Sequence, residues 1–167
     1  MIKPMLVIAF IMVSFSTVNA QSTADSDKHS PVRTLTYEQY EAYLKGEADN
    51  NMAMVAEINH FPLPDQVLKF KKELDLSPLQ LKKVNAINDY MHRRRVQTGE
   101  SIVRNERTLD SLFRYHKMDE GNLIFYTNRH GLYQGELKNA ILFACLATKK
   151  ELTPQQLAKF EALKKAN

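Results

Sequence analysis

Histidine and cysteine are the residues here that bind metal ions most readily, and two of them would meet in a helical hairpin. The spacing of apolar residues predicts one helix from 78 to about 117 and a second from 123 to 148. If they pair antiparallel about a turn near Gly121, residue 95 faces about residue 146, and His92 and Cys145 lie within two turns of each other. Imidazole and thiolate groups suit zinc, copper or nickel. The other candidate ligands in the chain are His60, His116, His130 and several methionines.

This metal site has a simple competing interpretation. No His-x-x-x-His or Cys-x-x-Cys pair supports it, Cys145 can be a small buried apolar side chain, and His130 lies on a predicted packing stripe. We therefore expect no cofactor, with Zn, Cu or Ni at His92 and Cys145 as the alternative.

Arginine is the second residue type that could carry function. The long predicted helix contains Arg93, Arg94, Arg95, Arg104, Arg107 and Arg114. Several of them share one side of that helix, where their charges and apolar stems could hold a protein client loosely. An ordinary solvated helix surface would have the same composition.

Catalytic motifs are missing from the sequence. It has no Gly-x-Ser-x-Gly elbow, no phosphate-cradling glycine loop and no zincin motif, and it contains 5 glycines in all. We expect a protein that is not an enzyme.

Two similar segments position these residues, because each predicts the start of a helix. The first is Leu76-Ser77-Pro78-Leu79-Gln80 and the second is Leu152-Thr153-Pro154-Gln155-Gln156. In each, the hydroxyl can accept from the third amide of the new turn, proline suits the first helical position, and glutamine can reach back to the cap. Thr36 and Gln39 predict a third capping box of the same kind.

The remaining elements are also helical. Short helices are expected after Thr36, within residues 52–58 and from Pro64, and a last helix from 154 to 165. No strand-like alternation occurs, so the fold class is all-α: an elongated antiparallel helical hairpin with short flanking helices. Polar residues in the middle of the long helix suggest a hydrated middle or a bend near Gly99.

The N-terminus predicts export. Residues 1–20 combine Lys3, a short apolar run and a small-residue cleavage pattern ending at Ala20, which is typical of a signal peptide; a membrane anchor would need a longer apolar run. Residues 21–33 predict a disordered tail, and residues 34–165 a single helical domain. The net charge of +4 is too small to indicate a nucleic-acid partner, and the single cysteine excludes an internal disulfide.

The doubled Leu-Ser/Thr-Pro-x-Gln pattern after a signal peptide resembles the LTXXQ-motif family, which includes the Spy and CpxP periplasmic chaperones and periplasmic heavy-metal sensor or resistance proteins. The segment Asn59-His-Phe-Pro-Leu-Pro before the first copy is similar to one subgroup. Some members carry histidine where this chain has Gln66 and Cys145.

The resemblance implies a periplasmic, cradle-like homodimer that binds unfolded or misfolded periplasmic proteins without ATP, or restrains an envelope-stress sensor protein. A heavy-metal sensor is the alternative that it implies. The Tyr- and Leu-bearing faces also exceed what one thin hairpin can cover, which favours a dimer.

Overall fold

The computed structural model describes residues 29–48 and 51–166, and the expected signal peptide and most of the expected tail lie outside this part. Six helices are described: α1 (Tyr37–Lys45), α2 (Met54–Glu57), α3 (Pro64–Lys69), α4 (Pro78–Arg114), α5 (Glu120–Glu151) and α6 (Pro154–Ala166). The described residues contain no strand. The all-α class is therefore confirmed.

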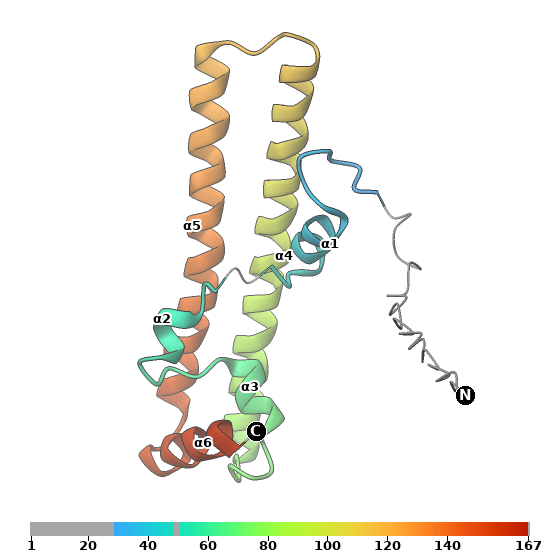
Figure 1. The fold of residues 1–167 in the computed structure, drawn as a ribbon. Coiled ribbons are helices and arrows are strands. Elements are labelled where there is room, and N and C mark those ends of the chain that lie inside the picture. The colour runs from blue at the N-terminus through green and yellow to red at the C-terminus, as the bar shows by residue number, and fades with distance from the viewer. Residues whose placement is uncertain (1–28, 49–50, 167) are drawn as a thin grey trace, which may run out of the picture.

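Helices α4 and α5 run side by side in opposite directions and form the long axis of the molecule (Figure 1). Asp119 begins α5 by accepting a hydrogen bond from the backbone N–H of Asn122 at 2.7 Å. Helices α1, α2 and α3 lie against the sides of this pair, and α6 crosses its base, far from the α4–α5 turn (Figure 1). No helix in the described ranges combines the length and apolar character needed to cross a bilayer.

The core consists of three apolar clusters along the α4–α5 pair. One joins α1 and the segment before it to Ile102, Val103 and Leu137. A second, at the base, includes Val84 and Phe160, and the third joins α2 to α5. Each short element thus covers one part of the long pair, because neither long helix can bury its apolar face alone.

Gly99 lies beneath α1 in the middle of α4, where the sequence suggested a hydrated region or a bend. A Cβ atom at position 99 would stand 2.1 Å from the backbone oxygen of Tyr43, so only glycine permits this approach. Thr98 and Asn105 are buried nearby. Helix α4 continues through Gly99 without interruption. The glycine therefore allows close packing of α1 and does not end the helix.

The segment before α1 is packed as well, which corrects the expected boundary of the tail. Val32 is 1% exposed and belongs to the core cluster around α1. Arg33 forms an ion pair with Asp110 at 2.8 Å, and Thr34 donates to Glu106 at 3.1 Å. Composition suggested a tail up to residue 33, but one valine and one arginine suffice to dock its end on α4.

Candidate functional site

The two repeated motifs lie at the base, where they begin α4 and α6. Ser77 Oγ accepts from the N–H of Gln80, and Thr153 Oγ1 accepts from the N–H of Gln156, both at 3.2 Å. Pro78 and Pro154 are the first residues of their helices. Leu152 is buried and Leu76 half-buried, both in the basal cluster. These motif residues position helices and offer no chemistry of their own.

The two candidate metal ligands lie in different surroundings. Cys145 is fully buried in the apolar cluster with Ala53, Ala56 and Ile141. His92 is exposed and lines a surface pocket that does not include Cys145. Within residues 29–48 and 51–166, no group of three or more His, Cys, Asp or Glu side chains is arranged to hold a metal ion.

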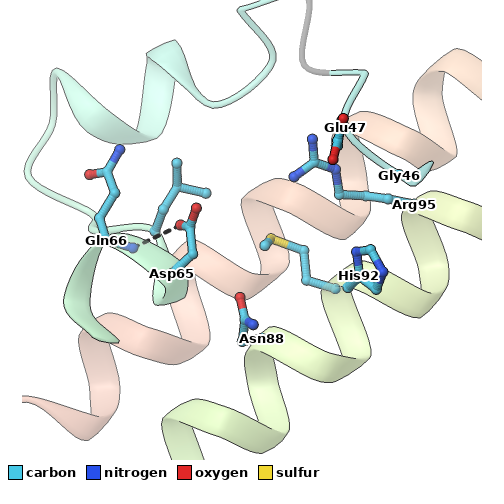
Figure 2. A pocket seen from close by; sticks show the side chains of 9 residues that line it. Gly46, Glu47, Asp65, Gln66, Asn88, His92 and Arg95 are labelled. Carbon is cyan, nitrogen blue, oxygen red and sulfur yellow. Dashed lines mark hydrogen bonds between the residues drawn. The ribbon is translucent and has the colours of Figure 1, made fainter. Parts of the chain in front are cut away.

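The pocket that contains His92 lies between the end of α1, α3 and the middle of α4 (Figure 2). Its volume is about 450 Å³, and its lining is mixed in charge. The lining residues are Gly46, Glu47, Leu63, Asp65, Gln66, Asn88, Met91, His92 and Arg95.

Two buried atoms around this pocket have no hydrogen-bond partner among the described residues: Gln66 Oε1 and Arg95 Nε. Gln66 uses its amide nitrogen to donate to Glu57 at 2.7 Å, and Arg95 reaches the carbonyl oxygen of Ala48 at 3.5 Å. Carboxylates stand at both ends of the pocket, beside Gln66 and beside Arg95 (Figure 2). The pocket has no dominant sign of charge that would select one class of ligand.

The predicted arginines divide among several surroundings. Arg93 and Arg107 are exposed, Arg95 lines the pocket of Figure 2, and Arg114 forms an ion pair with Asp110. Arg94 and Arg104 line two smaller pockets in the seam between α4 and α5.

These two smaller pockets share one side of the α4–α5 pair, which we call the open face. From α4 it receives Tyr90, Arg94, Ser101, Arg104 and Thr108, and from α5 Tyr126, Arg129, Tyr133, Glu136, Ala140 and Phe143. Asn105 and Asn139 line the pockets as well. The other members are three, four or seven residues apart in succession, the spacing that keeps side chains on one side of a helix. Arg129 was not among the residues expected from the sequence, although it lies between Tyr126 and Tyr133 at this spacing.

The opposite side of the pair carries Asp110 and Glu106, and the N-terminal segment docks there through Arg33 and Thr34. Asp110 accepts hydrogen bonds from Arg33 and Arg114, and these bonds, opposed in part by desolvation, hold the pKa of its carboxyl below the ordinary value of 3.8. Glu106 lies 3.0 Å from His130 Nδ1 and also accepts from Thr34.

Aromatic side chains of the open face meet across the two helices. The rings of Tyr90 and Phe143 pack edge to face with centroids 6.3 Å apart, and both side chains are exposed. Further along, the guanidinium of Arg129 lies over the rings of Phe125 and Tyr133, at 5.2 and 5.5 Å from their centroids. Such a strip can contact apolar and anionic groups together.

The α4–α5 turn also presents large apolar side chains to solvent. Those with more than 40% exposure near the turn are Phe113, Tyr115, Leu123, Ile124 and Phe125. None belongs to a core cluster of the described residues. Single exposed apolar residues are ordinary, but a group of this kind marks a candidate contact surface.

Comparison with known proteins provides no assignment: no family model, curated protein or solved structure matches this chain.

Proposed function

We propose that this chain is an exported, ATP-independent chaperone or envelope-stress adaptor that holds partly unfolded proteins on its open face. The observation that carries the proposal is the exposed Tyr90–Phe143 pair beside Arg94 in one seam between α4 and α5. Partly unfolded proteins expose apolar and charged groups together, and this seam offers partners for both. The resemblance to Spy and CpxP proteins, the expected signal peptide and an expected homodimer support the same role.

The experiment is an aggregation assay with an unfolded client protein at low salt. Mature protein at substoichiometric to equimolar amounts is expected to slow aggregation, and added salt is expected to weaken the effect because exposed charges are screened. Phe143→Ser and Arg94→Ala should each reduce the suppression several-fold.

Ile58→Ser is the control for Phe143→Ser. Ile58 follows α2, is 69% exposed, against 54% for Phe143, and does not line the seam pockets. If both variants lost the same amount of aggregation suppression, the client would be bound through exposed apolar residues in general and not through the open face. A wild-type protein that does not slow aggregation would overturn the proposed function.

A metal-binding sensor through His92 and Cys145 is the alternative proposal. It would require these residues to approach, since one is exposed and the other buried in an apolar cluster. Titration calorimetry with zinc, copper and nickel tests it: binding that weakens in both His92→Ala and Cys145→Ser would favour the sensor. If none of the three ions gave a measurable heat of binding, the sensor proposal would be overturned.

A further inference from the structure

We propose that the upper pocket of the open face binds a phosphate group, either free phosphate or a phosphate monoester. The pocket lies between the second half of α4 and the first half of α5 and has a volume of about 180 Å³. Its lining consists of Ser101, Arg104, Asn105, Thr108, Tyr126, Arg129 and Tyr133.

The charge of this lining has one sign. Two guanidinium groups, Arg104 and Arg129, contribute to one small pocket, and no carboxylate lines it. Arg104 also pairs with Glu100, whose carboxylate lies 3.6 Å from Arg104 Nη1 on an exposed helix surface, where such pairs contribute little. An oxyanion in this pocket could accept several charge-assisted hydrogen bonds from the guanidinium groups.

The guanidiniums are already oriented by their neighbours. Arg104 Nη2 donates to Ser101 Oγ at 2.9 Å, and Arg129 Nε donates to the hydroxyl of Tyr133 at 3.2 Å. Arg129 is also held by its stacking on Phe125 and Tyr133. Because these groups are placed before any ligand arrives, less side-chain entropy is lost on binding.

The three hydroxyl groups of the pocket differ in whether they can donate a hydrogen bond to a ligand. Ser101 and Thr108 already donate to the backbone oxygens of Gln97 and Arg104, at 3.0 Å each, so their protons are not available to a ligand. Tyr133 accepts from Arg129, which leaves its own O–H to donate into the pocket. Arg104, Arg129 and Tyr133 are therefore the groups that would bind the oxyanion.

Asn105 gives a reason to favour phosphate over an anion without protons. This residue is 4% exposed, its amide nitrogen donates to the backbone oxygen of Tyr126 at 3.1 Å, and its Oδ1 accepts no hydrogen bond within the described residues. Hydrogen phosphate keeps a proton at neutral pH and can donate as well as accept, as can the monoanion of a phosphate monoester, whereas sulfate at neutral pH cannot donate.

The test uses the mature chain and three probes: inorganic phosphate, glycerol 3-phosphate, and vesicles that contain phosphatidic acid. Binding is measured by calorimetry or co-sedimentation, with chloride adjusted to keep ionic strength constant. Saturable binding of a soluble probe would identify a free phosphate site, and binding of vesicles alone would identify a lipid headgroup. No binding of any probe would overturn the proposal.

Matched variants separate this pocket from general basicity. Arg129→Gln should weaken binding at least tenfold, Tyr133→Phe should weaken it a few-fold without a change in charge, and Arg107→Gln, which alters an exposed arginine outside the pocket, should have little effect. Equal losses in Arg129→Gln and Arg107→Gln would overturn the proposal. None of these variants changes Phe143 or Arg94, so failure here is distinguishable from failure of the chaperone activity.

Discussion

Gln80 and Gln156, the glutamines of the two repeated motifs, are hydrogen-bonded to each other through both side-chain amides. Gln80 Nε2 donates to Gln156 Oε1 at 2.8 Å, and Gln156 Nε2 donates to Gln80 Oε1 at 3.2 Å. Each oxygen also accepts from the backbone N–H of its own cap residue, and each nitrogen also donates to a backbone oxygen, of Glu151 or of Leu74. The pair thus joins the starts of α4 and α6 with all its hydrogen-bonding groups used.

Gln80→Glu should therefore destabilise the fold by about 1–3 kcal/mol. The substitution removes the two hydrogen bonds that Gln80 Nε2 donates and places a carboxylate oxygen against the oxygens of Gln156 and Glu151. The new carboxylate would have a raised pKa in the folded state for the same reason. The stability deficit of the variant relative to wild type should shrink as pH falls and the carboxyl is protonated. Urea unfolding at several pH values measures both effects.

Gln155→Glu is the control for this substitution. Gln155 is exposed in the first turn of the same helix α6, where a negative charge is favourable, so its variant should be neutral or slightly stabilised. A Gln80→Glu protein as stable as Gln155→Glu would contradict the importance of the paired amides.

The helix starts were predictable because capping is a local property of a few neighbouring residues. Thr36, Ser77 and Thr153 each supplied a cap that the structure contains. The contact between Gln80 and Gln156 was not predictable, because it depends on where α6 turns relative to α4. Repetition of a motif indicates similar local structure and says nothing about contact between the copies.

Tertiary contacts also explain why the middle of α4 differs from what its sequence suggested. Gly99 suggested a bend by its low helix propensity, but its role is to admit the backbone of Tyr43. Arg94 and Arg104 of the open face stand out in the sequence because α4 contains several arginines, whereas Arg129 is the one arginine of α5, and its place on this face depends on how α5 packs against α4. The division of the arginines among several surfaces follows from the packing of α1 and α3 on one side of α4.

Gly99→Ala should cost about 1–3 kcal/mol and loosen α1, because the added methyl group would overlap the backbone of Tyr43. Backbone cannot rotate away as a flexible side chain can, so α1 must shift. Thermal unfolding measures the loss of stability, and faster amide exchange within residues 37–45 would locate it.

Gly131→Ala is the matched control, since a Cβ at this position of α5 meets nothing within 4 Å. Alanine should stabilise this helix interior by up to about 1 kcal/mol. If both variants gained stability, the close approach of α1 to Gly99 would be contradicted.

Asp110→Asn should release residues 30–35 from α4, because it removes the carboxylate that binds Arg33 and Arg114. The folded-state pKa of Asp110 is lowered below 3.8, so its contribution to stability is present above that value and lost as pH falls through the lowered pKa. Amide exchange of residues 30–35 should be faster in the variant at neutral pH. The difference from wild type should narrow below pH 3.8, and a constant difference across this range would contradict the ion pair.

Thr148→Val tests a buried hydroxyl that contributes no hydrogen bond. Thr148 is 0% exposed, and its Oγ1 has no partner within the described residues. Because valine has the same shape and removes an unsatisfied polar atom, the variant should be neutral or up to about 1 kcal/mol more stable in urea unfolding. Thr148→Ala should instead lose stability through the cavity left by the methyl group. A loss in Thr148→Val as large as in Thr148→Ala would show that the hydroxyl is bonded in solution.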